Sequence, residues 1–125
     1  PVFYYRFAQA TPFPGGGPRA GWGAAHFAEL WYVFNHLNQE AWAWSEADGR
    51  IADEMSGYWV NFAASGDPNG IGLPRWAAFT NGAPTLLEFG IQTRRVAAPT
   101  DPQVQVFDAV YDAVRGSAFG VASTQ

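Results

Sequence analysis

Residues 45–68 read SEADGRIADEMSGYWVNFAASGDP and carry the clearest helix signal in the chain. Ser45 is a favourable N-cap, and Asp48 three positions later makes an acidic variant of the capping box. Apolar residues then recur at helical spacing, as Ile51, Met55, Tyr58, Trp59 and Phe62. Gly66 supplies a left-handed stop, and the proline that follows prevents continuation. We therefore predict a helix over 46–64 and a core that contains its stripe of Met55, Trp59 and Phe62.

The segment before this helix begins with a strand signal and continues into a loop. Val2 to Ala8 are largely apolar and aromatic without clean alternation, which predicts a strand buried on both faces. Thr11 to Pro18 is too dense in proline and glycine for a helix or a sheet, so it must be a loop. A short helix is predicted near Glu29 to Leu37, because one helical face gathers four apolar residues, Leu30, Val33, Phe34 and Leu37.

The segment after the long helix predicts a loop, two short strands and a last helix. Asp67 to Asn81 is irregular and rich in turn residues. Thr85 to Phe89 predicts a strand, which Thr93 to Ala97 either extends or pairs with. Asp101 to Val114 predicts a helix, and residues 117–125 are small and polar enough to form a flexible tail.

Composition limits the classes of protein to which the chain can belong. Its 125 residues are 48% hydrophobic and include 6 Trp, 5 Tyr and 10 Phe, which suits one domain with a substantial core. The sequence shows no sign of a second domain, and the strand predicted at its start suits an α/β sheet. So many large rings are difficult to bury in a domain of this size, so we expect some of them to face another chain.

Charge and cysteine content exclude several functions. The net charge is −4 and the chain has no lysine, which argues against nucleic-acid binding and against a polybasic membrane anchor. No apolar run approaches the roughly 20 residues of a membrane span. Without cysteine there is no disulfide framework and no thiolate metal site, so the redox compartment stays open.

Two histidines are the candidate proton-transfer groups. His26 follows the small residues Gly23-Ala24-Ala25 and precedes an aromatic run, and its near-neutral pKa suits a general base. The residues alone also fit a surface or hydrogen-bonded structural histidine. His36 lies near the end of the predicted short helix, where a cation is mildly favourable, and we interpret it as structural. Two histidines without cysteine or an ordered set of carboxylates do not make a zinc site.

The surroundings of His26 are one of several motifs that occur in the order found in a known family. Residues 23–34 read GAAHFAELWYVF, residues 53–63 read DEMSGYWVNFA, and residues 65–69 read SGDPN. The other matching segments are VFYYRF (2–7), LPRW (73–76) and LLEFG (86–90). Over roughly the first three-quarters of the chain, this series resembles the C-terminal part of the type B carboxylesterases. These are the cholinesterase and para-nitrobenzyl esterase-like group of α/β-hydrolases. The resemblance implies that residues 1–116 are the C-terminal segment of an α/β-hydrolase domain. That segment is expected to hold late core strands, a histidine loop and packing helices, and residues 117–125 a flexible tail.

The resemblance further implies that His26 is the general base of a Ser-His-acid triad. The nucleophile of this fold sits at a Gly-x-Ser-x-Gly elbow, and no serine of this chain lies in one. Because the chain order is serine, acid, histidine, both partners are expected upstream, in a separate N-terminal portion. This chain alone is then expected to be inactive. The implied substrate is a small-molecule carboxylic ester, and no cofactor or metal is implied.

Three neighbours of His26 have alternative interpretations. The family prefers glycine or alanine at the position of Phe27, where a bulky ring either crowds the site or lines it. We interpret Phe27 and Trp31 as substrate-pocket residues, with core packing or contact with another portion as the alternative. Glu29 either holds the loop through hydrogen bonds or is a carboxylate favoured by a helix N-terminus.

A second class of function also fits the residues. The chain opens on a strand at Pro1 without a signal-peptide pattern, so we expect the C-terminal portion of a larger hydrolase. The alternative is a non-catalytic binding module, either a cholinesterase-like adhesion domain or an aromatic-rich carbohydrate binder, suggested by the ring content and the absent serine. An upstream Gly-x-Ser-x-Gly followed by an acid favours the enzyme. Secretion and a cytoplasmic location both remain open.

Overall fold

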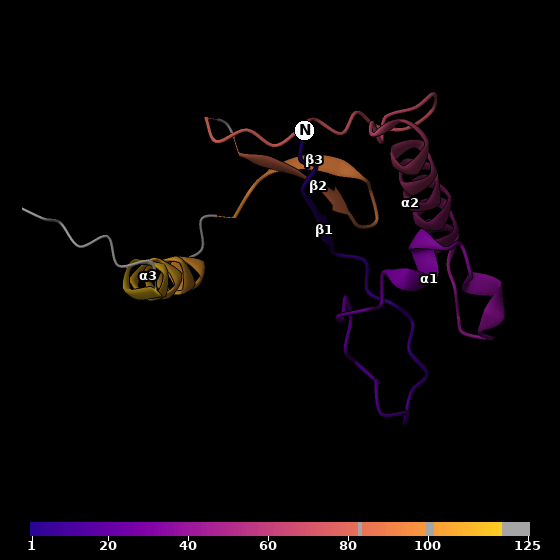
Figure 1. Cartoon of the computed structure of the whole chain (residues 1–125). Helices are drawn as coiled ribbons and strands as arrows, with labels where there is room; N and C mark the ends of the chain where they lie inside the picture. The colour runs from indigo at the N-terminus through magenta and orange to yellow at the C-terminus, as the bar shows by residue number, and fades with distance from the viewer. Residues whose placement is uncertain (83, 100–101, 119–125) are drawn as a thin grey trace, which may run out of the picture.

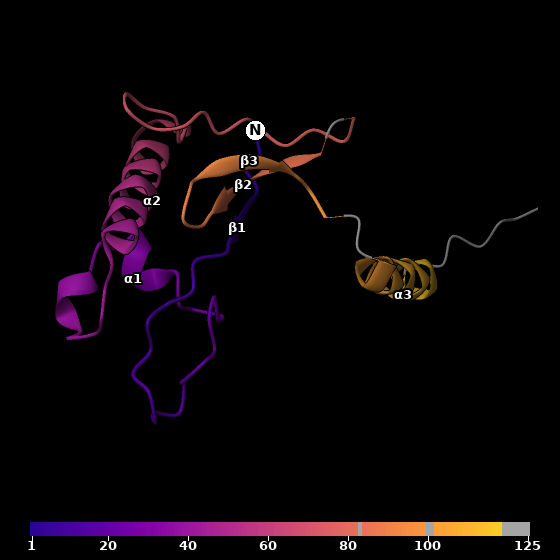
Figure 2. The same cartoon turned by 180° about the vertical axis from the view of Figure 1, so that it is seen from behind.

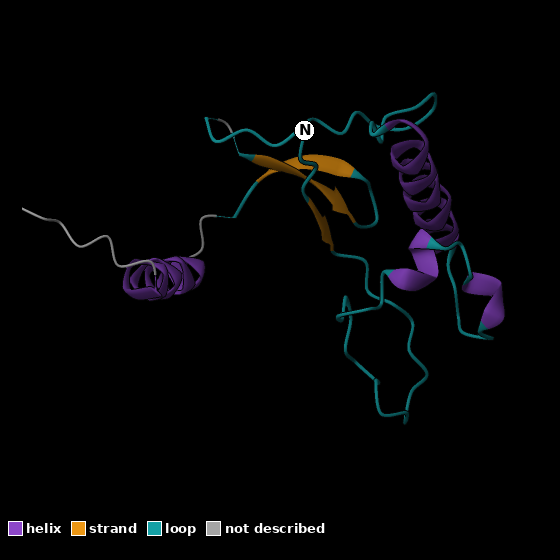
Figure 3. Cartoon of the chain, viewed as in Figure 1, coloured by secondary structure: helices purple, strands orange, loops and turns teal. Residues whose placement is uncertain are grey.

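The computed structural model describes residues 1–82, 84–99 and 102–118. Its elements follow in the order β1 (Tyr5–Phe7), α1 (Leu30–Val33), the 3₁₀ helix η1 (Leu37–Gln39), α2 (Glu46–Ser65), β2 (Thr85–Phe89), β3 (Arg94–Ala97) and α3 (Pro102–Ala118). A small sheet lies beside the long helix α2, and a long excursion of the chain separates β1 from α1 (Figures 1, 2 and 3).

Helix α2 confirms the helix predicted from the sequence and continues one residue further, to Ser65. The Ser45 hydroxyl accepts a hydrogen bond from the Asp48 backbone, and the Asp48 carboxylate accepts one from the Ser45 backbone, so both halves of the capping box form. Gly66 ends the helix in the left-handed conformation (φ 76°) and donates its N–H to the carbonyl of Phe62 at 2.8 Å. Both ends of α2 are therefore specified by local sequence.

The core forms where α2 packs against one face of the sheet. Met55 and Tyr58 are fully buried on α2, as is Phe89 on β2, and the Tyr58 and Phe89 rings meet with their centroids 5.6 Å apart. Trp59 is partly buried against this cluster. Phe62, which was predicted in the core, is half exposed. It lies near the end of α2, where its ring meets that of Phe3 with the centroids 6.0 Å apart.

The sheet is mixed, with strand order β1-β2-β3. β1 runs parallel to β2, and β2 runs antiparallel to β3, which pairs with it rather than extending it. β2 has the predicted bounds, but β1 is shorter than the predicted Val2–Ala8. Its first residues diverge from β2, since the carbonyl of Val2 accepts a hydrogen bond from Phe79 at 2.7 Å. β1 is also not buried on both faces, because the Arg6 side chain is half exposed.

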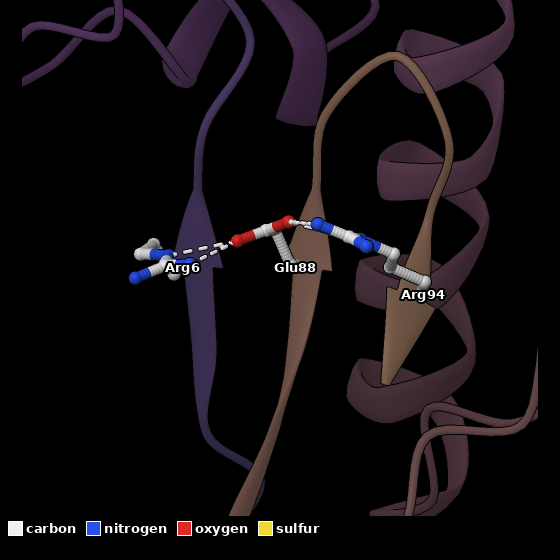
Figure 4. A network of polar contacts seen from close by, with 3 residues as sticks. All are labelled: Arg6, Glu88 and Arg94. Atoms are coloured by element: carbon white, nitrogen blue, oxygen red, sulfur yellow. Dashed lines mark hydrogen bonds and ion pairs between the residues drawn. The ribbon is translucent and has the colours of Figure 1, made fainter. Parts of the chain in front are cut away.

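An ion-pair network crosses all three strands (Figure 4). The buried carboxylate of Glu88 on β2 accepts hydrogen bonds from Arg6 on β1 through one oxygen. Its other oxygen accepts bonds from Arg94 on β3, at 3.0 and 3.2 Å. The bonds from Arg6, opposed by burial and aided by those from Arg94, lower the pKa of Glu88. The network fixes β1, which leads into the loop that carries His26.

The helix predicted over Glu29 to Leu37 is wrong in extent. α1 covers a single turn, and Asn35 follows it with a positive φ of 51° before η1 begins. Of the predicted apolar face, Val33 is buried and Leu37 packs against the core, whereas Leu30 and Phe34 are exposed. One turn of helix does not sustain the periodicity on which the prediction rested.

Helix α3 lies apart from the sheet and α2 in both views (Figures 1 and 2). It runs further than the predicted Val114, to Ala118, two residues into the predicted tail. Its described apolar residues are exposed, namely Val106, Phe107, Val110, Tyr111 and Val114. The predicted start at Asp101 and the remaining tail, residues 119–125, lie outside the described residues. Within the described part of the chain, no helix has the length and apolarity that crossing a membrane requires.

Candidate active site

The histidine loop, defined here as residues 8–29, leaves the sheet after β1 and returns at α1 (Figure 1). At its start the N–H of Ala8 donates to the carbonyl of Phe89 at 2.7 Å, which continues the strand pairing by one residue. Further along, the N–H of Thr11 donates to the carbonyl of Gly23 at 3.3 Å. This bond closes the base of the proline- and glycine-rich excursion, because it brings Gly23 back to Thr11.

His26 occupies a tight turn on the returning arm of the loop. The N–H of Ala28 donates to the carbonyl of Ala25 at 3.0 Å, which places His26 and Phe27 at the two central positions of the turn. The His26 side chain is exposed, and its ring meets that of Phe27 with the centroids 4.0 Å apart. Neither imidazole nitrogen has a hydrogen-bond partner among the described residues. The ring is thus free to pair with groups from outside the described chain.

Phe27 takes a backbone conformation that side chains normally avoid. Its φ is 67°, in the left-handed region, at the second central position of the turn. Turns with a positive φ at this position favour glycine, because a Cβ atom is crowded there. This is a physical reason for glycine, though not for alanine, the other residue expected at this position from the family resemblance. Here the turn forms with phenylalanine, whose side chain is 60% exposed.

The other predicted site residues are not all brought together with His26. Trp31 packs with the rings of Phe13 and Trp42, at centroid distances of 6.2 and 5.0 Å, under the guanidinium of Arg19. This aromatic cluster is separate from the contact between His26 and Phe27. The Glu29 carboxylate accepts no hydrogen bond from a described residue, although its charge adds to burial in raising the pKa of Tyr5.

The structure reveals a buried polar cluster that the sequence did not single out. Asp48 accepts hydrogen bonds through one carboxylate oxygen from the Gln9 amide, at 2.9 Å, and from the Tyr32 hydroxyl, at 2.8 Å. Burial alone would raise the pKa of Asp48, but the bonds from Ser45, Tyr32 and Gln9 together lower it. Only the capping box gave a sequence signal, since the contact with Gln9 joins residues far apart in the chain.

Neither a metal centre nor a pocket is associated with His26 in the described residues. In that part of the chain, no three His, Cys, Asp or Glu side chains are grouped as metal ligands would be. An apolar hollow of about 390 Å³ lies between the start of the chain and α2, and its lining includes Phe3, Trp59 and Trp76. Neither Phe27 nor Trp31 lines this hollow.

Solved structures with the same arrangement define the class of the fold. One is the carboxylesterase EST55 of Geobacillus stearothermophilus at pH 6.2, with a TM-score of 0.64 and 32% sequence identity over 86% of this chain and 21% of that chain. Another is a PNB esterase, with a TM-score of 0.67 and 20% identity over 84% of this chain and 21% of that chain. The parallel pair β1–β2, with α2 on one face, is therefore part of an α/β-hydrolase fold.

Sequence comparison identifies the family. Residues 1–107 match the carboxylesterase family, and the chain belongs to it. It is 32% identical to human cocaine esterase over 80 residues, which make up 63% of this chain and 14% of that protein. It is 33% identical to mouse carboxylesterase 5A over 101 residues, 76% of this chain and 18% of that protein. The chain thus spans less than a fifth of the length of these relatives.

Proposed function

We propose that this chain supplies the general base, His26, of a serine carboxylester hydrolase. The nucleophilic serine and the triad acid come from a further portion of the same hydrolase, and the substrate is a small-molecule carboxylic ester. Membership of the carboxylesterase family supports the reaction class. The observation that carries the role of His26 is its exposed imidazole, presented in a turn and without a hydrogen-bond partner among the described residues. A ring already committed within this chain would not be available to a serine and a carboxylate.

In this proposal each proton has a defined path through His26. One ring nitrogen takes the proton of the serine hydroxyl as its oxygen attacks the ester carbonyl, while the acid holds the other nitrogen and stabilises the imidazolium. The imidazolium then gives the proton to the departing alcohol. In the second half His26 takes a proton from water, which attacks the acyl-enzyme, and returns it to the serine as the acid product leaves. The oxyanion is stabilised by backbone N–H groups of the other portion.

The neighbours of His26 have supporting roles in this proposal. The Phe27 ring covers one side of the imidazole and lines the site on the substrate side, which its contact with His26 supports. Trp31 belongs to an aromatic cluster and contributes to the pocket more remotely. Glu29 influences the site through its charge, because its carboxylate has no hydrogen-bond donor among the described residues.

The test compares the two histidines in the complete enzyme, meaning this chain together with the portion that supplies the serine and the acid. Hydrolysis of p-nitrophenyl butyrate is expected to fall by about 10²- to 10⁴-fold in His26→Ala, as for loss of a general base. His36→Ala is the matched control, because His36 is also exposed and also lies against an aromatic ring, that of Phe34. It is expected to keep wild-type activity. Wild-type activity in His26→Ala would refute the proposal, and this chain alone is expected to show no hydrolysis.

A further inference from the structure

We infer that Asp48 is a positioning residue for His26, which it serves by holding both ends of the histidine loop through hydrogen bonds. The inference rests on the proposed function of His26 and goes beyond it, because it assigns a role to a buried carboxylate on another element. Asp48 is the third residue of α2, whereas His26 lies on the loop between β1 and α1.

The two donors to the Oδ1 oxygen of Asp48 lie at the two ends of the histidine loop. Gln9 lies at its start, just after β1, and Tyr32 lies on α1, just after its end. Both donate to the same carboxylate oxygen, Oδ1, at 2.9 and 2.8 Å. Asp48 is only 2% exposed, Gln9 and Tyr32 are also buried, and hydrogen bonds to a buried charge are stronger than those between neutral groups. The carboxylate therefore fixes where the loop departs and where it returns.

The other carboxylate oxygen of Asp48, Oδ2, is hydrogen-bonded at the N-terminus of α2. Oδ2 accepts hydrogen bonds from the backbone N–H and the hydroxyl of Ser45, at 2.8 and 2.7 Å. Capping of α2 therefore occupies Oδ2 and leaves Oδ1 for the loop. Because α2 packs against the sheet, the bonds from Gln9 and Tyr32 to Asp48 attach both ends of the loop to a rigid element. A residue required only for capping would not need two further buried donors.

Apart from these bonds, the histidine loop is held by the bond between Thr11 and Gly23 and by the packing of Phe13 and Arg19 on the ring of Trp31. Its excursion contains several prolines and three glycines at positive φ, Gly16, Gly21 and Gly23, and most of its side chains are exposed or half-buried. A catalytic base must nevertheless meet its serine within a fraction of an ångström, and a misplacement of about 1 Å can lower the rate by roughly 100-fold. The hydrogen bonds from Gln9 and Tyr32 to Asp48 supply that restraint at both ends of the loop.

The experiment uses Tyr32→Phe and Gln9→Leu in the complete enzyme, each of which removes one donor to Asp48. We expect kcat for p-nitrophenyl butyrate to fall between about 10- and 100-fold with KM little changed, because the imidazole is displaced while ester binding is not. We also expect faster amide hydrogen exchange in residues 23–29. Tyr58→Phe is the matched control, because Tyr58 is equally buried but donates its hydroxyl hydrogen bond to Pro74, away from the loop. It should change neither quantity.

Three outcomes separate this inference from the proposed function. If His26→Ala abolishes activity but Tyr32→Phe and Gln9→Leu keep wild-type kcat and exchange, the positioning role is wrong and the proposed function stands. If Tyr58→Phe lowers kcat as much as Tyr32→Phe, the effect is one of general stability and the inference is overturned. If His26→Ala keeps activity, the proposed function fails. Should one variant not fold, judged by exchange protection of α2, the other decides the result.

Discussion

Helix α2 and the histidine loop meet at Asp48 but are held in place by different forces. α2 has both caps formed and buries Ile51, Met55 and Tyr58 against the sheet. The loop buries few side chains and depends on a small number of polar contacts, chiefly those of Gln9 and Tyr32. The difference separates two requirements: apolar burial stabilises the fold, whereas a few directed hydrogen bonds set the geometry that chemistry needs. Substitutions in the two regions should therefore have different consequences.

The largest expected effect on stability is in α2. Met55→Ala removes a fully buried side chain from the core, so the free energy of unfolding should fall by about 2–5 kcal/mol. Trp22→Ala removes a larger ring from the histidine loop, but that ring is 59% exposed, so the change should stay within about 0.5 kcal/mol. Chemical denaturation of both variants measures the contrast. Equal losses would show that the loop contributes to the stability of the core as α2 does.

The next effect concerns Glu88, whose ion pair with Arg6 holds β1, the strand that leads into the histidine loop. Glu88→Gln keeps the shape of the side chain but removes the charge shared by Arg6 and Arg94, and we expect a loss of about 1–2 kcal/mol at pH 7. Both arginines are at least half exposed and can turn to water, which limits the loss. Arg95→Gln is the control, because it removes an exposed charge from β3, the strand of Arg94, without touching this network.

The loss of stability in Glu88→Gln should depend on pH. Folding lowers the pKa of Glu88. The charge of Glu88 therefore contributes fully to the free energy of unfolding above its unfolded pKa of about 4.3, and this contribution disappears as the pH falls through the lower folded pKa. The stability difference between wild type and Glu88→Gln should therefore shrink as the pH is lowered below about 4. A difference that stays constant down to pH 2 would contradict the role assigned to the charge.

The contrast between the two regions also explains what the sequence could predict. The bounds of α2 were predicted almost to the residue, because Ser45, Asp48 and Gly66 act on their immediate neighbours. β2 was predicted with equal success, since its apolar run is flanked by turn residues. His26 was found as a candidate through the motif around it, and the turn that carries it depends on neighbours from Ala25 to Ala28.

The features that the sequence missed depend on contacts between distant residues. The bonds from Gln9 and Tyr32 to Asp48 join three elements, and no local pattern marks either donor. α1 was predicted too long because Asn35 takes a positive φ that apolar periodicity does not reveal. Phe62 was placed in the core by its spacing, but it is half exposed, because spacing along a helix does not show which of its turns other elements cover.

A smaller effect is expected at the helix cap. Ser45→Ala removes the hydroxyl that accepts from Asp48 and donates to its carboxylate, so the free energy of unfolding should fall by about 1 kcal/mol. Ser65→Ala is the control, because that hydroxyl lies at the exposed C-terminal end of α2 and donates to the carbonyl of Asn61. Comparable losses in the two variants would show that the cap makes no special contribution to α2.

The smallest effect tests strain in the turn that presents His26, and its sign is opposite to the others. At φ 67° the Phe27 side chain is held in a conformation that disfavours a Cβ atom by about 1–2 kcal/mol, whereas glycine adds about 0.5–1 kcal/mol of backbone entropy to the unfolded chain. Phe27→Gly should therefore stabilise the protein by roughly 0.5–1 kcal/mol. Phe34→Gly is the matched control, because Phe34 is equally exposed but has a negative φ of −91°, so it should destabilise. Destabilisation by Phe27→Gly would mean that the ring contact with His26 outweighs the strain, and that this contact helps to hold the imidazole in its turn.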